Sequence, residues 1–198
     1  MPRKRADGQT PEWAKLYELA AAQAGYLQLA QARDAGYSPP LLEYYVREGR
    51  VERVARGIFR LAHYPPSDHE DLVVAWLWSD RLGIFSHETA LVLHELSDAL
   101  PAKQHLTVPS GWERRRLRLP ENLILHVADL AENDKDWKGP LPVTTPLRTV
   151  VDCKTGHSPP DLVRQAVNQG VKRGLFTREE VRRALGARGR PQETRADR

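Results

Sequence analysis

The sequence predicts an α+β protein, with an N-terminal winged helix-turn-helix followed by a mixed α/β C-terminal domain. Three short helical patterns, each ended by glycine, precede a β-hairpin pattern, and this order is typical of a winged helix. After residue 67, helical patterns alternate with strand-like runs, which predicts a second domain of mixed class. The expected divisions are a flexible basic N-terminus at 1–10, a winged helix-turn-helix at 11–63, an α/β domain at 67–186 and a disordered basic tail at 187–198.

The first two helices are short. Thr10 followed by Pro11 indicates a helix start, because threonine caps helices and proline suits the first helical position. Gly25 ends this helix, since glycine readily adopts the left-handed conformation found after helix ends. A second helix is expected over 29–35, closed by Gly36.

The third helix is the candidate recognition helix. Ser38 is its expected N-cap, and the helix runs from Pro39 to Glu48. Helical periodicity places one set of residues toward the core: Leu41, Leu42, Tyr45 and Val46. The opposite side is open to a partner and carries Pro40, Glu43, Tyr44 and Arg47.

A basic hairpin follows the third helix. The run "RVERVARGIFRL" predicts two short strands around a turn at Ala55, Arg56 and Gly57. Its arginines suit phosphate binding, because the planar guanidinium grips phosphate with two hydrogen bonds. A helix can enter the major groove while a wing approaches flanking phosphates. The predicted DNA-binding residues are therefore Gln28, Ser38, Tyr44, Arg47, Arg50, Arg53, Arg56 and Arg60.

The second domain begins with a capping pattern at Ser67–Glu70 and a helix that runs to about Gly83. A helix capped by Ser86 follows it, and then strand-like runs at 104–109 and 123–128. Three more helices are expected, which start at Thr145-Pro146, at Ser158-Pro159 and at the capping pattern of Thr177 and Glu180. In the first of these, Arg148 is expected to pair with Asp152 one turn later.

Composition narrows the class of protein. No apolar run approaches the roughly 20 residues that span a bilayer, and the N-terminus has no signal-peptide pattern, so we expect a cytoplasmic protein without a membrane partner. The single cysteine, Cys153, excludes an internal disulfide and is expected to be a buried, inert thiol. Both ends of the chain are basic and its middle is acidic, which suits a polyanion bound by a terminal module.

A second basic cluster lies in "GWERRRLRLPEN", where Arg114, Arg115, Arg116 and Arg118 follow Trp112. Charge beside an aromatic ring is typical of single-stranded nucleic-acid contacts. The same residues are equally consistent with a solvated loop between strands. The cluster is a candidate second nucleic-acid contact.

We predict no enzyme activity, no cofactor and no metal site. Both His-Glu pairs, at His87 and at His94, lack the second histidine of the H-E-x-x-H zinc motif. Asp129 with Asp136 and Lys138 has the bare form of a metal-dependent nuclease core, but the Gly139-Pro140 that follows argues against the strand such a core needs. Cys153 and His157 have no third group to orient them as a catalytic pair.

The N-terminal segment "GYLQLAQARDAGYSPPLLEYYVREGRVERVARGIFRL" resembles the winged-helix domain of AbiEi-type antitoxin regulators. Further along, "SHETALVLHEL", "LTVPSG", "LILHV" and "LPVTTPLRTVVD" resemble the run that follows this domain in those proteins. The resemblance extends from about Trp13 to Leu185. The acidic third helix, with Glu43 and Glu48 beside Arg47, departs from a typical reading helix.

This resemblance implies a repressor that binds an inverted repeat in its own promoter, as two protomers on double-stranded DNA. It also implies the antitoxin of a type IV toxin-antitoxin system, whose toxin is a nucleotidyltransferase that the second domain counters without tight binding. The alternative from the residues alone is a winged helix that docks a partner protein and does not bind DNA. Salt dependence separates the two, because DNA affinity falls steeply as salt rises.

Overall fold

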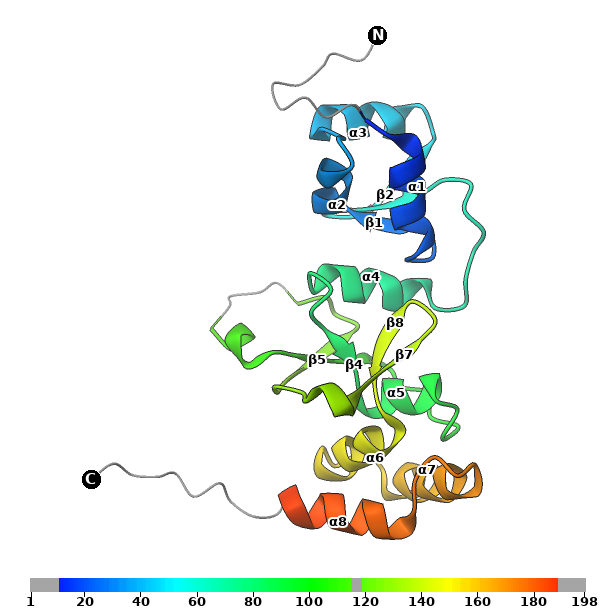
Figure 1. Ribbon diagram of the computed structural model, residues 1–198, viewed down its shortest axis with the longest axis vertical. Coiled ribbons are helices and arrows are strands. Elements are labelled where there is room, and N and C mark those ends of the chain that lie inside the picture. The colour runs from blue at the N-terminus through cyan, green and yellow to red at the C-terminus, as the bar shows by residue number, and fades with distance from the viewer. Residues whose placement is uncertain (1–10, 115–118, 189–198) are drawn as a thin grey trace, which may run out of the picture. The chain divides into compact units, whose positions relative to one another are not determined.

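The computed structural model describes residues 11–114 and 119–188, so the predicted N-terminus at 1–10 and residues 189–198 of the tail predicted at 187–198 lie outside the described residues. Residues 187–188, which we also assigned to the tail, end the last helix. The chain divides into two compact units, Met1–Leu82 and Gly83–Arg198 (Figure 1). The predicted α+β class, with N-terminal helices and strands before a mixed α/β region, is confirmed.

The first unit folds helices around a three-stranded sheet. Its elements are α1 (Trp13–Ala21), β1 (Tyr26–Gln28), α2 (Leu29–Asp34), α3 (Pro39–Arg47), β2 (Val51–Ala55), β3 (Ile58–Leu61) and α4 (Glu70–Trp78). The strands lie in the order β1-β3-β2 and both pairs are antiparallel. Leu16, Leu27, Leu42 and Phe59 are buried in the core of this unit. The first three helices and the β2–β3 hairpin are therefore the elements of a winged helix.

Helix α4 falls in the first unit, whereas we placed residues from 67 onward in the second domain. Polar contacts explain this grouping. Glu70, at the start of α4, accepts hydrogen bonds from Tyr26 of β1 at 3.0 Å and from Arg60 of β3 at 3.1 Å. The Gln28 amide donates to the carbonyl of Leu77 at 2.7 Å. These contacts hold α4 against the sheet, and the sequence gives no local sign of them.

The second unit contains a five-stranded mixed sheet in the order β6-β5-β4-β8-β7. Its elements are β4 (Ile84–Phe85), α5 (His87–Leu93), β5 (Gln104–Val108), β6 (Leu123–Val127), β7 (Lys135–Lys138), β8 (Leu141–Thr144), α6 (Pro146–Thr155), α7 (Pro160–Lys172) and α8 (Arg178–Arg188), with 3-10 turns at Ser110–Trp112 and Glu132–Asp134. Strands β5 and β6 pair in parallel, as do β4 and β8, and the other two pairs are antiparallel. Figure 1 shows α6, α7 and α8 gathered on one side of this unit.

Local signals placed several helix starts correctly. Ser38 caps α3 and Thr145 caps α6, each by accepting a hydrogen bond from the backbone N–H three residues later. Thr177 and Glu180 form the predicted reciprocal box at the start of α8. Helix α1 begins at Trp13, two residues later than Pro11, where we expected it to start.

The predicted pair of Arg148 and Asp152 is confirmed, at 2.8 Å, and Arg148 also pairs with Asp134 at 2.5 Å. The Arg148 and Asp152 side chains are only 10% and 6% exposed. The double pairing joins α6 to the 3-10 turn before β7.

None of the described helices is long and apolar enough to cross a membrane.

Candidate nucleic-acid interface

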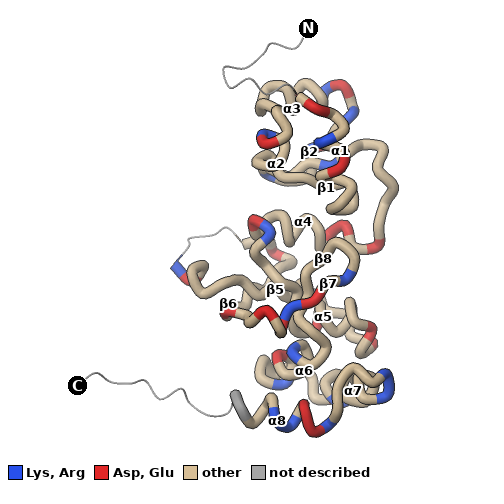
Figure 2. Tube along the Cα trace, viewed as in Figure 1, with Lys and Arg blue, Asp and Glu red and all other residues tan. Residues whose placement is uncertain are grey.

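Helix α3 presents a polar face on the first unit. Leu42 is buried, and Leu41, Tyr45 and Val46 pack partly against the core, so the opposite face is exposed as expected. Tyr44 on that face is 47% exposed, and Glu43 and Arg47 are exposed beside it. Figure 2 shows acidic and basic segments interleaved along α3 and the strand that follows. The Ser38 hydroxyl is committed to capping the helix through Leu41 N–H.

The four arginines of the wing and its approach, Arg47, Arg50, Arg53 and Arg56, have different surroundings. Arg50 lies over two aromatic rings, with its guanidinium carbon 4.1 Å from the centre of Trp13 and 4.8 Å from that of Tyr45. Arg53 pairs with Glu43 of α3 at 2.8 Å. Arg56 sits in the turn between β2 and β3, where Gly57 has the positive φ that the turn requires. Among the described residues, neither Arg47 nor Arg56 has an ion-pair partner.

Two of the predicted DNA-binding residues are held by internal contacts. The Arg60 side chain is 14% exposed and binds both Glu70 and the carbonyl of Tyr64. The Gln28 side chain reaches Leu77 and takes part in the capping box of α2. Both side chains are engaged in fixing α4 to the sheet and are not presented to a partner in the way that the wing arginines are.

The carboxylate of Glu70 is the centre of this internal cluster. Burial works against its charge, but hydrogen bonds from Tyr26, Ser67 and Arg60 outweigh that effect and lower the pKa of Glu70. Burial and the neighbouring carboxylate raise the pKa of Tyr26 to about 12. The site is thus a charged cluster that anchors the sheet on which the wing is built.

The second basic cluster is only partly described. Arg114 is exposed in the turn after Ser110–Trp112, while Arg115, Arg116 and Arg118 lie outside the described residues. Trp112 is buried, with 6% exposure. Its ring is therefore not presented for the stacking with a base that the sequence suggested.

We argued against a nuclease core because we expected no strand before Gly139-Pro140, and the structure corrects this expectation. Asp136 and Lys138 do lie on a strand, β7, and Gly139-Pro140 forms the turn into β8. Asp129, however, follows β6 at the opposite edge of the sheet, where its carboxylate binds the backbone and hydroxyl of Ser110. The two aspartates therefore do not form one metal-binding core.

Cys153 is fully buried, as predicted, and burial raises the pKa of its thiol to about 12. At neutral pH the thiol is protonated, so it is a poor nucleophile. This removes the Cys153–His157 pair as a catalytic candidate.

Three histidines that sequence reasoning did not connect meet in the second unit. One ring nitrogen from each of His87, His105 and His126 lies within 4.8 Å of the other two. Burial is the main cause that lowers the pKa of His105 and of His126, which favours neutral rings at pH 7. They come from α5, β5 and β6 and have no common spacing, so only the pairing of the strands could have revealed them. We predicted no metal site, but these three rings form a group that could hold a metal ion.

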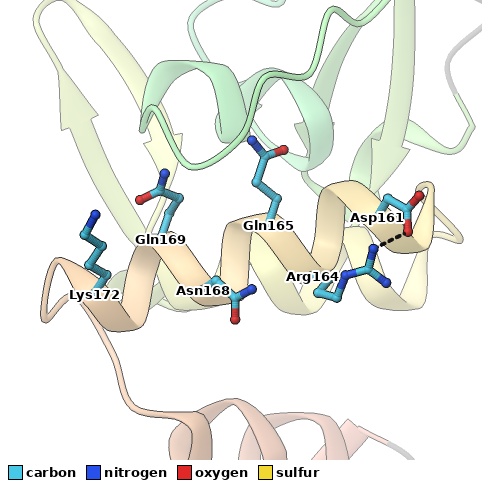
Figure 3. Close-up of a pocket in the computed structure, with 6 residues that line it drawn as sticks. All are labelled: Asp161, Arg164, Gln165, Asn168, Gln169 and Lys172. Atoms are coloured by element: carbon cyan, nitrogen blue, oxygen red, sulfur yellow. Dashed lines mark ion pairs between the residues drawn. The ribbon is translucent and has the colours of Figure 1, made fainter.

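A shallow hollow lies on the polar face of α7 and is lined by Asp161, Arg164, Gln165, Asn168, Gln169 and Lys172 (Figure 3). Several of these side chains already have protein partners. Arg164 pairs with Asp161 at 2.8 Å, and Asn168 accepts a hydrogen bond from Arg178 of α8. Gln165 accepts one from the backbone N–H of Asp98. The hollow is an exposed helix face whose side chains form hydrogen bonds to α8 and to the backbone at Asp98.

Comparison with known families bears on the first unit. Residues 14–62 match the family described as "Transcriptional regulator, AbiEi antitoxin", and this stretch contains α3 and the whole wing. This segment is similar to the AbiEi antitoxin family. The match supports a general role for the chain as a transcriptional regulator and antitoxin, in a family whose members are generally not enzymes.

Outside the AbiEi segment, the comparisons concern the fold. The crystal structure of the RV2827C protein from Mycobacterium tuberculosis is similar, with a TM-score of 0.54 and 16% sequence identity. The similarity covers 90% of this chain and 71% of that chain. At this identity the likeness shows a shared fold and nothing of function. No curated protein matches the chain.

Proposed function

We propose that this protein is a DNA-binding repressor of its own operon. The observation that carries the proposal is the exposed face of α3 next to Arg47 and Arg56, two cations without a carboxylate partner among the described residues, within the AbiEi segment. In this mechanism α3 enters a major groove, and the wing arginines bind flanking phosphates. Two protomers occupy an inverted repeat and block the promoter sterically.

The test is a fluorescence-anisotropy titration with DNA from upstream of the gene and with a scrambled duplex, each at two salt concentrations. We expect tighter binding to the native duplex and a steep loss of affinity with salt, because bound arginines release counterions from DNA. The variant Arg47→Ala/Arg56→Ala removes both unpaired cations and should lose most of the affinity. Arg183→Ala, an exposed arginine of α8, is the matched control and should bind like the wild type.

A second candidate function is a winged helix that docks a partner protein. The observation that favours it is the exposure of Tyr44 on α3 and Val54 on β2, at 47% and 43%. Aromatic and aliphatic side chains of this kind are common anchors of protein interfaces. If neither duplex binds and the double variant behaves like the wild type, this candidate replaces the repressor.

The antitoxin part of the proposal is that the chain counters a nucleotidyltransferase toxin of a type IV system, with the second unit contributing that activity. The support is the AbiEi match together with the separate compact fold of the second unit. Co-expression of the cognate toxin with the Arg47→Ala/Arg56→Ala variant tests it. If the two activities are separable, this variant still rescues growth although it no longer binds DNA. Lost rescue would mean that protection depends on DNA binding.

A further inference from the structure

Two of the three clustered histidines are brought together by strand register. Strands β5 and β6 pair in parallel, with Thr107 opposite His126. His105, two residues before Thr107, therefore lies on the same face of the sheet and diagonally next to His126. The rings lie 5.2 Å apart, and Nδ1 of His105 is 3.0 Å from Nε2 of His126.

The third ring arrives from the start of α5. Ser86 follows β4 and is the N-cap residue of this helix, and its N–H donates to the carbonyl of His105 at 3.1 Å. The next residue, His87, then stacks on His126 with ring centres 3.6 Å apart. His87 has φ 50°, in the left-handed region that residues other than glycine adopt at an energetic cost. The fold thus accepts a strained backbone at the point where this ring joins the cluster.

Space for the His87 ring is left by a glycine. A Cβ added at Gly156, at the end of α6, would lie 2.8 Å from Cδ2 and 3.0 Å from Nε2 of His87, and 2.9 Å from the carbonyl oxygen of Asp152. Gly156 itself has φ −82°, which any residue can adopt, so the backbone does not require glycine here. Its small size leaves room for both the His87 ring and the Asp152 carbonyl.

We propose that His87, His105 and His126 bind one divalent transition-metal ion, with Zn²⁺ the best suited. Three imidazoles and no carboxylate favour such an ion over Mg²⁺ or Ca²⁺, which take oxygen ligands. Zinc with bonds of about 2.0–2.1 Å in tetrahedral geometry needs nitrogens about 3.3 Å apart, and His105 and His126 are already close to this spacing. The His87 ring turns out of its stack to complete the set, and the fourth position is left to water.

Outer contacts define which nitrogen of His87 faces the ion. Its Nδ1 is 2.9 Å from the Ser86 hydroxyl, which in turn accepts a hydrogen bond from Thr107 at 2.7 Å. Metal-bound histidines are commonly fixed by such a partner on the second nitrogen, which leaves Nε2 for the metal.

This proposal concerns the second unit and does not depend on DNA binding. The test uses untagged full-length protein, stripped of metal with a chelator, dialysed, and titrated at about pH 7.5 with ZnCl₂ by calorimetry. We expect one ion per chain. A parallel titration with CoCl₂ is expected to give the visible absorption bands of a four- or five-coordinate nitrogen site. This readout requires no variant.

Variants then assign the ligands. His105→Ala and His126→Ala are each expected to weaken zinc binding by at least about 100-fold, and Ser86→Ala by roughly 10-fold. His94→Gln is the matched control, because His94 is a buried histidine of the same unit whose Nε2 binds the Thr144 carbonyl instead. This control should bind zinc like the wild type.

Gly156→Ala retains all three histidines, crowds the His87 ring and the backbone carbonyl of Asp152, and is expected to weaken binding as well. Circular dichroism of each variant identifies loss of fold. If an alanine variant of a histidine does not fold, the Gly156→Ala result and the cobalt spectrum of the wild type decide. The proposal is overturned if folded wild-type protein takes up no stoichiometric zinc, or if folded His126→Ala or Gly156→Ala protein binds zinc as tightly as the wild type.

Discussion

Replacing Glu43 by glutamine should strengthen DNA binding. Glu43 lies on the exposed face of α3 and pairs with Arg53 of the wing at 2.8 Å. Its carboxylate therefore places a negative charge on the proposed DNA face and occupies a guanidinium that could bind phosphate. Glutamine keeps the size of the side chain and removes the charge.

The expected magnitudes follow from exposure and counterion release. The two side chains are 56% and 48% exposed, so loss of the pair should lower the free energy of unfolding by only about 0.2–1 kcal/mol. If Arg53 gains one phosphate, the slope of log affinity against log salt becomes steeper by about 0.9. Between 50 and 200 mM salt, the variant should then lose about 3.5-fold more affinity than the wild type does.

Fluorescence anisotropy across that salt range measures the slope, and urea denaturation measures stability. The gain should shrink when Glu43→Gln is combined with Arg53→Ala, because the freed cation is then absent. Glu179→Gln breaks a comparable exposed pair with Arg183 and should leave DNA binding unchanged. Weaker binding by Glu43→Gln would refute the reasoning, since it would mean that the carboxylate contacts DNA or holds Arg53 in its binding position.

Three further predictions concern the second unit. Arg148→Ala should lower the free energy of unfolding by about 3–5 kcal/mol in urea denaturation, because it leaves two aspartates without their buried partner. Burial lowers the pKa of His94, so the folded protein favours its neutral ring. The free energy of unfolding should therefore decrease as pH falls below about 6.5, by up to about 1.4 kcal/mol per pH unit. His94→Gln, which can still donate to the Thr144 carbonyl, should make the free energy of unfolding less dependent on pH in this range, as measured by urea denaturation. Gly170→Ala would place a Cβ 2.0 Å from the Phe176 ring and should cost about 1–3 kcal/mol, visible as a lower Tm.

Elements with local signals could be predicted from the sequence, and elements defined by distant pairing could not. Caps and closing glycines identified α2 and α3, and the Arg148–Asp152 pair followed from helical spacing. Strands β1, β4 and β8 are two to four residues long and pair with strands that are distant in the chain. Gly139-Pro140 was interpreted as a strand breaker, but it is the turn of a hairpin, and Gly139 has the positive φ such a turn uses.

The same distinction applies to the candidate sites. Exposure of Tyr44 and Arg47 followed from the period of α3, because an amphipathic helix fixes both faces at once. The partners of Arg53 and Arg60 did not follow, since Glu43 and Glu70 reach them from other elements. Charge counted along the chain therefore overstated the number of cations available to DNA.

Four arginines, Arg47, Arg50, Arg53 and Arg56, remain on the proposed DNA face, and their number limits what one protomer can contribute. If each binds one phosphate, together they account for a salt slope of about −3.6, and two protomers on an inverted repeat account for about −7. The difference in slope between the wild type and a variant with all four replaced by alanine isolates this contribution from that of other basic residues. Because Arg50 lies over the rings of Trp13 and Tyr45 and Arg53 is paired, the contribution of one protomer should fall short of the limit. A difference larger than about 3.6 would therefore require a second protomer on the DNA, and it would support the inverted-repeat arrangement without knowledge of the operator sequence.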